Sequence, residues 1–433
     1  MAGLDTQLNM RARPSIAVIG GGYAGMAAAL TLAEHGMAPS VFEAGHTLGG
    51  RARALSLPDH PMALDNGQHL LLGAYHTTLQ LIRDVHATPP WLRLPLQLYS
   101  EGGLQLRAAP LPAPWHTLLG LLRADGLPLA DRLRAAGFMA AQHRRNFRLE
   151  QDCSVGQLLT GQGERLIRLL WQPLCLAALN TPVEVASAQT FLNVLRDSLT
   201  GRREDSDLIL PTCDLGELFP LPAAQRIRAL GGDIQTGHRI RKMAYQNGRM
   251  LLDGQPFDRV VCAVAPFHAA ALLRPIEALH PLADTIDRLR YWPIATVWLQ
   301  YPADIRLPRP MTGLTGTLAQ WVFDRSHTHG QSGLLAVVVS VAPARLDVAA
   351  LARQVTHELQ QAFGLPAQPL WQRTVVERRA TWSCEAHVVR PAHRTAIDAL
   401  YLAGDYTDSP YPATLEAAVQ SGVQCAGHIL STA

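Results

Sequence analysis

The chain runs Ser15-Ile16-Ala17-Val18-Ile19-Gly20-Gly21-Gly22-Tyr23-Ala24-Gly25 close to its N-terminus. The apolar residues before Gly20 predict a buried strand, and the Gly-x-Gly-x-x-Gly spacing after them predicts a tight turn into a helix that ends near His35. Gly20 permits the turn, Gly22 lets the backbone approach a phosphate, and Gly25 lets the helix lie close to the sheet. We therefore expect a dinucleotide pyrophosphate at this helix N-terminus, where backbone N–H groups and the helix dipole favour an anion. The alternative is an ordinary βαβ unit with a glycine turn and no nucleotide.

Two further segments extend this prediction. Val41-Phe42-Glu43 predicts a second strand that ends in an acid, and an acid at this place binds the adenosine ribose of a dinucleotide. Ala44 directly follows it and belongs to the same expected contact. Next, Gly49-Gly50 bring backbone N–H groups near the first loop, and Arg51 can meet a phosphate with a planar fork of donors. A surface turn beside a salt bridge is the alternative interpretation of this second segment.

Composition indicates a soluble globular protein. The 433 residues are 48% hydrophobic and 17% charged, which is enough chain for two large cores. The net charge of +3 is too small to indicate nucleic-acid binding. The six cysteines lie far apart without a C-x-x-C pair, so we expect a reduced, cytoplasmic protein. His327-Thr328-His329 is the closest approach to a metal-ligand pair, but it lies in a polar loop that is better explained as a solvated turn, so no metal is expected.

The C-terminal segment supplies a second set of candidate contacts. Residues 399–403 read as a buried strand, Gly404-Asp405 follow it, and residues 414–430 have apolar positions at helical spacing. Asp405 could accept hydrogen bonds from ribitol hydroxyls. The helix N-terminus at Thr414 and Leu415 could place backbone N–H groups at the negatively charged end of a reduced flavin.

Together these segments resemble the FAD-dependent amine oxidase and phytoene desaturase superfamily. The resemblance implies an α/β fold with a Rossmann-like FAD-binding domain of the glutathione reductase type and an inserted α+β substrate domain. It also implies non-covalent FAD, with Glu43 on the adenosine ribose, Arg51 and the Gly49-Gly50 turn near the pyrophosphate, and Asp405 on the ribitol. Thr47 stands where the family often has an arginine, which removes one expected phosphate contact.

The same resemblance gives a division of the chain into domains. Residues 12–86, 222–272 and 390–433 are expected to form a discontinuous FAD-binding domain. Residues 87–221 and 273–389 are expected to form the substrate domain, the first helical in pattern and the second richer in strands.

A narrower resemblance rests on the middle of the chain. Residues 171–182 (Trp171 to Pro182), 186–199 (Ala186 to Leu199) and 206–211 (Ser206 to Pro211) look like those of the squalene-associated FAD-dependent desaturases, now understood as hydroxysqualene dehydroxylases of bacterial hopanoid synthesis. This resemblance implies reduction of an allylic-type alcohol, hydroxysqualene, to squalene by FADH2. The implied partners are a hydrophobic C30 isoprenoid substrate and the preceding squalene-synthase-like enzymes.

The implied chemistry requires a long apolar tunnel and a group that protonates the leaving oxygen. The candidate acids are Asp65, His69, Asp197 and Asp207. Each has a structural alternative, because an acid or histidine in such a place can hold a turn or pair with a neighbouring arginine.

A lipid substrate also raises the question of membrane contact. Residues 110–148 combine Trp115, several leucines and six arginines, as an interfacial helical hairpin does. An amphipathic helix pair packed on the substrate domain explains the same pattern, so both interpretations stay open. The expected location is therefore the cytoplasm, either free or peripheral on the inner face of the cell membrane.

Two other functions remain open from the sequence. A phytoene-type desaturase shares the fold but oxidises a saturated bond of an isoprenoid, and a non-catalytic FAD-bound scaffold could hold prenyl synthases together. Residues 231–252, with their glycine turns and short strands, resemble the β-meander of the superfamily. An amine oxidase is disfavoured, because Thr414 replaces the usual aromatic residue two before the helix glutamate. The lysine that such oxidases usually have near the flavin is also missing, since Lys242 lies in the expected β-meander.

Overall fold

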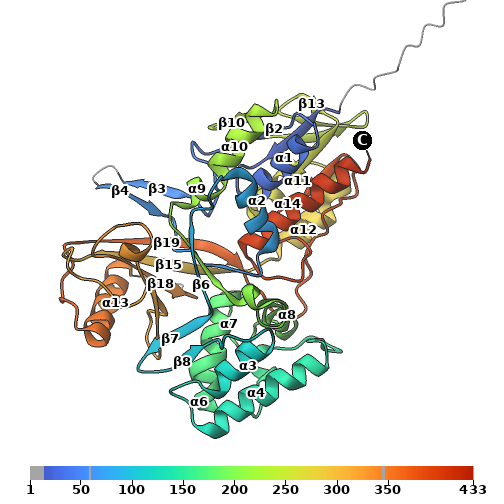
Figure 1. Cartoon of the computed structure of the whole chain (residues 1–433). Coiled ribbons are helices and arrows are strands. Elements are labelled where there is room, and N and C mark those ends of the chain that lie inside the picture. The colour runs from blue at the N-terminus through green and yellow to red at the C-terminus, as the bar shows by residue number, and fades with distance from the viewer. Residues whose placement is uncertain (1–13, 58–59, 344–346, 433) are drawn as a thin grey trace, which may run out of the picture.

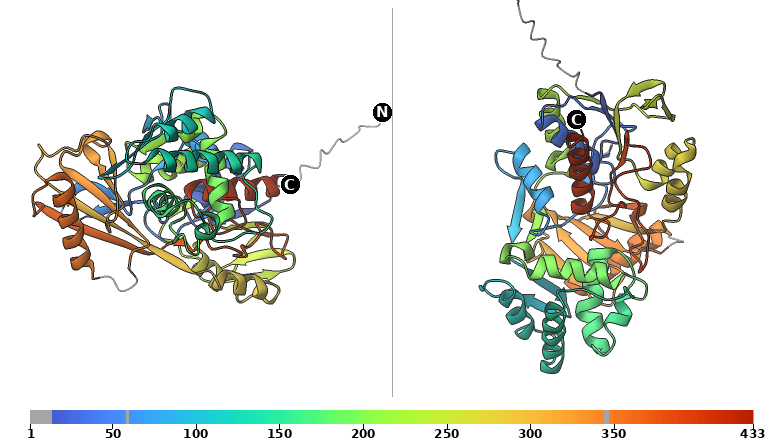
Figure 2. Two further views of the ribbon diagram at one scale, coloured as in Figure 1. Left: turned by 90° about the horizontal axis from the view of Figure 1, so that it is seen from below. Right: turned by 90° about the vertical axis from the view of Figure 1, so that its right-hand side faces the viewer.

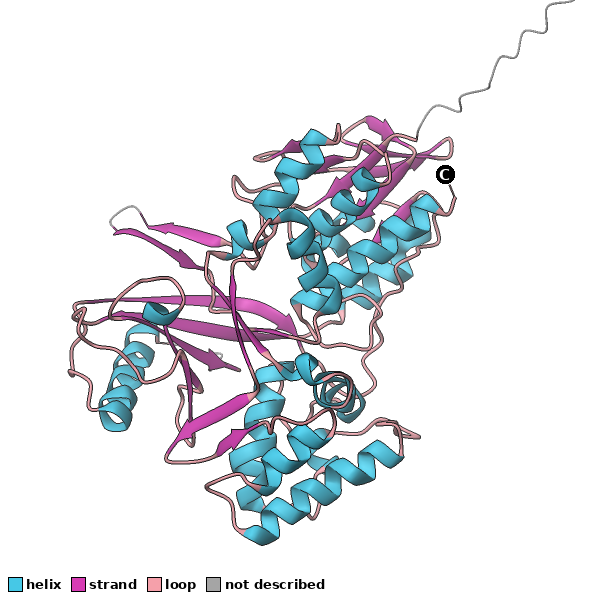
Figure 3. Ribbon diagram, in the orientation of Figure 1, coloured by secondary structure: helices cyan, strands magenta, loops and turns pink. Residues whose placement is uncertain are grey.

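The computed structural model describes residues 14–57, 60–343 and 347–432. Three parts are distinguished in Figure 1: a parallel sheet with its helices at the top right, a large sheet at the left, and a group of helices at the bottom. Figure 3 shows the same division by secondary structure, with the strands gathered in the upper and left parts.

The parallel sheet draws its strands from three separate segments of the chain. Its order is β10-β2-β1-β14-β20, and all neighbours are parallel. The strands are β1 (Ile16–Ile19), β2 (Ser40–Phe42), β10 (Asp233–Gln235), β14 (Arg259–Cys262) and β20 (Leu400–Leu402). β1 and β20 are buried throughout, as expected for apolar runs covered on both faces. This sheet confirms the predicted α/β class.

Helices from the two ends of the chain pack on each other beside this sheet. Helix α1 (Tyr23–Glu34) contacts α14 (Leu415–Leu430) along much of its length, and the right-hand view of Figure 2 shows α14 beside the blue N-terminal elements. The contact is close because of small residues: a Cβ on Gly422 would lie 2.1 Å from the carbonyl oxygen of Ala24. Helices α2 (His76–Val85) and α10 (Pro220–Ala229) complete this layer.

A seven-stranded sheet forms the left part of the molecule. Its order is β19-β15-β18-β17-β16-β7-β8, antiparallel except for the β16–β7 pair. The strands are β7 (Gln97–Glu101), β8 (Gln105–Arg107), β15 (Tyr291–Gln300), β16 (Met311–Leu314), β17 (Trp321–Asp324), β18 (Leu334–Ser340) and β19 (Trp371–Trp382). Side chains alternate between its two faces. Ala295 and Val297 share a core with helix α13 (Val348–Phe363), so Ile294 and Thr296 face the other way.

The helices at the bottom of Figure 1 come from the middle of the chain. They are α3 (Trp115–Leu122), α4 (Leu129–Arg144), α5 (Val155–Leu158), α6 (Glu164–Leu166), the π-helix η1 (Ile167–Trp171), α7 (Gln172–Leu179) and α8 (Ala188–Leu199). The amphipathic segment at 110–148 therefore does contain two helices, and α3 packs on α4.

Smaller elements connect these parts. Two further antiparallel sheets pair β3 (Ala54–Leu57) with β4 (His60–Asp65), and β5 (Leu71–Leu72) and β6 (Trp91–Leu94) with β9 (Leu208–Pro211). The expected meander is β11 (Met243–Gln246), β12 (Arg249–Leu252) and β13 (Gln255–Phe257). The remaining elements are η2 (Arg203–Ser206), α9 (Leu215–Leu218), α11 (Pro266–Leu273), η3 (Glu277–Leu279), α12 (His280–Asp287) and η4 (Arg325–His327).

Candidate active site

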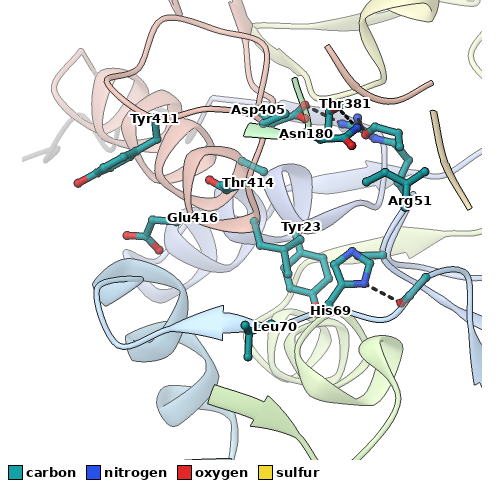
Figure 4. A pocket seen from close by; sticks show the side chains of 18 of the residues that line it. Tyr23, Arg51, His69, Leu70, Asn180, Thr381, Asp405, Tyr411, Thr414 and Glu416 are labelled. Carbon is teal, nitrogen blue, oxygen red and sulfur yellow. Dashed lines mark hydrogen bonds and ion pairs between the residues drawn. The ribbon is translucent and has the colours of Figure 1, made fainter. Parts of the chain in front are cut away.

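One large cavity lies between the parallel sheet, the seven-stranded sheet and the helices below them. Its volume is about 1310 Å³, and the residues that line it come from all three parts. Ligand pockets ordinarily measure about 300–1,000 Å³, so this cavity has room for more than one ligand. Figure 4 shows its polar part, where Arg51 and His69 lie opposite Tyr411 and Glu416.

The two glycine turns meet at one end of this cavity. Gly22 is the N-cap of α1 and has no side-chain cap, so the helix N-terminus keeps free N–H groups. Gly22 forms a bridge with Gly49, and a Cβ on Gly22 would lie 3.8 Å from Cα of Gly50. Gly20 also lines the cavity, with φ of +106°. Gly25 does not line it and instead permits packing, because a Cβ there would lie 1.9 Å from the oxygen of Gly20.

Glu43 is held at the end of β2 by backbone donors. Its carboxylate accepts hydrogen bonds from the N–H of Gly21 at 2.7 Å and from the N–H of Gly45 at 2.6 Å. Each carboxylate oxygen has a second lone pair left to accept a bond from a hydroxyl. Glu43 and Ala44 both line the cavity, so Glu43 is available to a sugar bound there.

Arg51 and Asp405 form an ion pair across 354 positions of sequence, with 2.6 Å between Nη2 and Oδ1. Arg51 also donates to the carbonyl of Ala380 on β19 at 2.7 Å. Burial opposes the charge of Arg51, but Asp405 and then Glu377 outweigh it and raise its pKa. From the sequence we expected Arg51 near the pyrophosphate and Asp405 at the ribitol. In the structure the two side chains bind each other.

The start of α14 forms another part of the wall. Thr414 is the N-cap and its hydroxyl accepts from the N–H of Ala417 at 3.1 Å. Gly404, Thr414 and Leu415 line the cavity as expected. Gly404 has φ of +151°, and a Cβ there would lie 2.5 Å from the ring of Tyr406, so a side chain is excluded at this turn.

Two of the four candidate acids do not line the cavity. Asp65 is buried, accepts from the N–H of Leu215 at 2.9 Å and pairs with Arg325 at 3.2 Å. Burial raises the pKa of Asp65 to about 6 against the opposing charge of Arg325. Asp207 accepts from Nε of Arg93 at 2.7 Å. Both carboxylates therefore hold together segments that are far apart in the sequence. This is the pairing with arginine that we gave as the alternative to an acid role.

The other two candidate acids, His69 and Asp197, do line the cavity. Nδ1 of His69 lies 2.7 Å from the carbonyl of Gly67, which can only accept, so this nitrogen carries the proton and Nε2 carries a lone pair. Burial lowers the pKa of His69, which favours this neutral form. Asp197 is bound by two nitrogens of Arg196, at 2.6 and 2.9 Å, and accepts from the hydroxyl of Tyr411 at 2.8 Å.

Several polar residues that line the cavity were not predicted from the sequence. They are Tyr23, Asn180, Thr296, Glu377, Thr381 and Tyr411. Asn180 ends α7 in the left-handed conformation and donates to the hydroxyl oxygen of Thr381 at 2.9 Å. Thr296 and Glu377 lie in long strands, where alternate side chains point to the same face of the sheet. A polar residue at a position that alternation assigns to an apolar, inward face is the signal that could have identified them.

One stretch of the cavity wall, formed by the large sheet and the helices below it, is mainly apolar. It includes Leu98, Leu106, Leu121, Met139, Leu170, Trp171, Phe191, Leu195, Met311, Trp321 and Phe323. The hydroxyls of this wall already donate within the protein: Thr117 to the carbonyl of Pro114, Ser198 to that of Val194 and Ser206 to that of Arg203. The indole Nε1 of Trp171 is a buried donor without a hydrogen-bond partner, but the three hydroxyls offer no unused donor, which suits a ligand that is mainly hydrocarbon.

The amino-acid sequence matches the family described as flavin containing amine oxidoreductase over residues 23–430. The chain belongs to this family. Membership confirms the predicted enzyme class, an FAD-dependent oxidoreductase, and its FAD cofactor. The site fits this cofactor in an amine oxidoreductase fold, because the glycine turns leave a cradle that a Cβ would fill and Glu43 and Asp405 stand at different parts of it.

Relatives and solved structures of flavin amine oxidoreductase type agree with the predicted resemblance. The chain is 28% identical to a hydroxysqualene dehydroxylase of Rhodopseudomonas palustris, over 96% of this chain and 98% of that protein. It is 24% identical to a probable zeta-carotene desaturase of Synechococcus elongatus, with the same shares covered. The cyclohexylamine oxidase of Brevibacterium oxydans has the same fold, with a TM-score of 0.73 at 16% identity over 97% of this chain and 99% of that one.

Within the part of the chain that the structure describes, no helix is both long and apolar enough to cross a membrane.

Proposed function

We propose that this protein removes the hydroxyl of hydroxysqualene reductively to give squalene for hopanoid or other triterpenoid synthesis. The observation that carries the proposal is the cavity itself, which begins at the glycine turns and continues between apolar walls whose hydroxyls donate within the protein. The likeness to the Rhodopseudomonas palustris enzyme over nearly the whole chain supports it.

The proposed cofactor contacts follow the cavity from one end to the other. The turns at Gly20-Gly21-Gly22 and Gly49-Gly50 hold the pyrophosphate, and Glu43 accepts from the adenosine ribose. Asp405, fixed by Arg51, accepts from the ribitol, and the start of α14 faces the negative end of the flavin. When bound and reduced, FAD supplies the hydride that replaces the hydroxyl.

The protein orients the substrate and excludes water around it. Nε2 of His69 carries a lone pair, so in this state it accepts a hydrogen bond from the substrate hydroxyl and does not donate a proton. Asp197 and Tyr411 form a second polar point on the wall. Asp65 and Asp207 have a structural task in this proposal, since each is already bound to an arginine.

The proposal includes contact of residues 110–148 with the inner face of the cell membrane. Trp115, Leu129 and Leu133 are 59%, 65% and 56% exposed. Six arginines and two aspartates give the segment a charge of +4, while the whole chain carries only +3. Exposed apolar side chains among arginines suit a bilayer surface with anionic lipids. Helix α3 also lines the cavity through Thr117 and Leu121, so the contact surface adjoins the substrate channel.

Two organisational features belong to the same proposal. Residues 12–86, 222–272 and 390–433 bind FAD, and residues 87–221 and 273–389 bind the substrate. Squalene-synthase-like enzymes supply that substrate from isoprenoid diphosphates.

Anaerobic incubation of the photoreduced protein with hydroxysqualene tests the function. We expect squalene to form, seen by gas chromatography with mass spectrometry, while the flavin absorbance of the oxidised form returns. A phytoene-type desaturase, favoured by the likeness to the Synechococcus elongatus protein, would instead reduce oxidised flavin when given a carotene precursor. A scaffold would bind the synthases and leave the reduced flavin unchanged.

A further inference from the structure

Five carboxylates line the cavity among the residues that the structure describes. Four of them already have strong partners. Glu43 accepts two backbone N–H bonds, Asp197 is bound by Arg196 and Tyr411, and Asp405 is paired with Arg51. Glu416 accepts from the N–H groups of Thr77 and Thr78 at 3.0 and 2.9 Å and from the Thr78 hydroxyl at 2.7 Å. These four carboxylates are committed to the protein or to the expected cofactor.

The fifth carboxylate, Glu377, is held only weakly. Its two contacts are with Nδ2 of Asn66 at 3.4 Å and with the N–H of Arg379 at 3.3 Å, both longer than ordinary hydrogen bonds to a carboxylate. Arg51 lies near enough to feel its charge, but the bonds of Arg51 go to Asp405 and the carbonyl of Ala380. Glu377 is therefore the carboxylate with most of its capacity unused.

Strand register shows where Glu377 points. It lies directly opposite Ile294 of β15, and Ile294 lies opposite Ser340 of β18, so the three side chains share one face of the sheet. This face lines the cavity, and its next row holds Thr296 and Val338. Glu377 thus stands on a mixed face of the cavity, where Ile294 and Val338 alternate with the hydroxyl-bearing Ser340 and Thr296.

Glu377 is partly buried, and its two long hydrogen bonds leave most of its acceptor sites free on the cavity side. The charge of Glu377 adds to that of Asp405 in raising the pKa of Arg51, but the bonds of that guanidinium go to Asp405 and Ala380, so the carboxylate oxygens of Glu377 stay available. A carboxylate in this setting is of use where positive charge develops during a reaction.

We propose that Glu377 stabilises the positive charge that develops on the isoprenoid when its hydroxyl leaves. This rests on the proposed function. The C–O bond breaks and the oxygen keeps both electrons, and it leaves as water with one of the two hydrogens that FADH2 gives up, as a proton. The hydrogen and the two electrons that form the new C–H bond are those that reduced FAD supplies. Glu377 forms no covalent bond and acts by its charge alone.

The test measures equilibrium binding of two probes to the FAD-loaded protein. One is farnesyltrimethylammonium, a cation on an isoprenoid chain, and the other is its uncharged isostere with a tert-butyl group. We expect the wild-type protein to bind the cation about tenfold more tightly, as a single partly desolvated charge can achieve. Glu377→Gln should abolish this preference without changing affinity for the isostere, and Glu377→Asp should keep most of it.

Glu277→Gln is the matched control, because Glu277 is exposed and does not line the cavity. It should keep the tenfold preference. Equal binding of the two probes by wild-type protein, which requires no variant to fold, would overturn the proposal, as would a preference that survives in Glu377→Gln. The proposed function fails separately, if wild-type protein yields no squalene in the anaerobic assay whatever it does with the probes.

Discussion

Replacement of Gly422 by alanine tests whether the close contact between α14 and α1 builds the cofactor site. A Cβ at this position would lie 2.1 Å from the oxygen of Ala24 and 3.0 Å from the nitrogen of Ala28. Both are backbone atoms of α1, so no side-chain rotation can relieve the clash. The two helices must separate by about 1 Å to restore an ordinary contact.

The expected cost follows from two opposing effects. Overpacking of a close contact costs about 1–3 kcal/mol, and the rigid backbone on the other side favours the upper end. Alanine gains about 1 kcal/mol over glycine in a helix. We therefore expect Gly422→Ala to lower the free energy of unfolding by about 2 kcal/mol. FAD should also bind more weakly, because the N-termini of α1 and α14 both face the cavity.

Gly427→Ala on the same helix is the control, since nothing lies within 4 Å of the Cβ that it adds. It should stabilise the protein by up to about 1 kcal/mol. Urea unfolding followed by circular dichroism, together with titration of the apoprotein with FAD, measures both effects. If Gly422→Ala is as stable as Gly427→Ala and binds FAD normally, the two helices do not fix the site as described.

Three further predictions concern the cofactor, acid stability and the membrane. Glu43→Gln should weaken FAD binding about tenfold to hundredfold by loss of charge-assisted bonds; unchanged affinity in an FAD titration would remove Glu43 from the cofactor site. Burial, and then the charge of Arg325, lower the pKa of His329 to about 4. The unfolded chain thus takes up this proton first as pH falls, and the fold should lose about 2 kcal/mol between pH 7.5 and pH 5. His329→Gln should show a pH dependence smaller by that amount in urea unfolding, and an identical dependence would contradict the assignment. Flotation with anionic liposomes should be lost in Trp115→Ser/Leu133→Ser but kept in Leu370→Ser, which changes an exposed leucine outside the segment; equal flotation of both variants would exclude the proposed contact.

The glycine turns and the acid that line one end of the cavity could be predicted from the sequence for a local reason. Gly20, Gly22 and Glu43 act within one βαβ unit, so their spacing alone fixes the turn, the helix N-terminus and the acid at the end of the second strand. Asp405 could be placed because a strand and a Gly-Asp turn precede a helix there. Its bond to Arg51 could not, since it joins residues 354 positions apart.

The substrate half depends on long-range pairing that spacing does not encode. Whether Asp65 faces a cavity or a partner is decided by Arg325, which is 260 positions away. Glu377 acquires its place through the register of β19 against β15, and a shift by one residue would turn it to the face that α13 covers. The tautomer of His69, by contrast, is fixed locally, by the turn that brings the carbonyl of Gly67 to Nδ1.

The position of β20 at the edge of the parallel sheet, with α14 against α1, has a consequence for biosynthesis. The ribosome makes β1 and α1 long before β20 and α14, because residues 35–399 lie between them. Until then, β14 lacks its neighbour β20 in the sheet and the apolar side of α1 is uncovered. The nascent polypeptide must be protected from aggregation through these two surfaces. The flavin site is therefore completed only after α14 has been made, and a bound flavin joins segments that are synthesised at widely separated times.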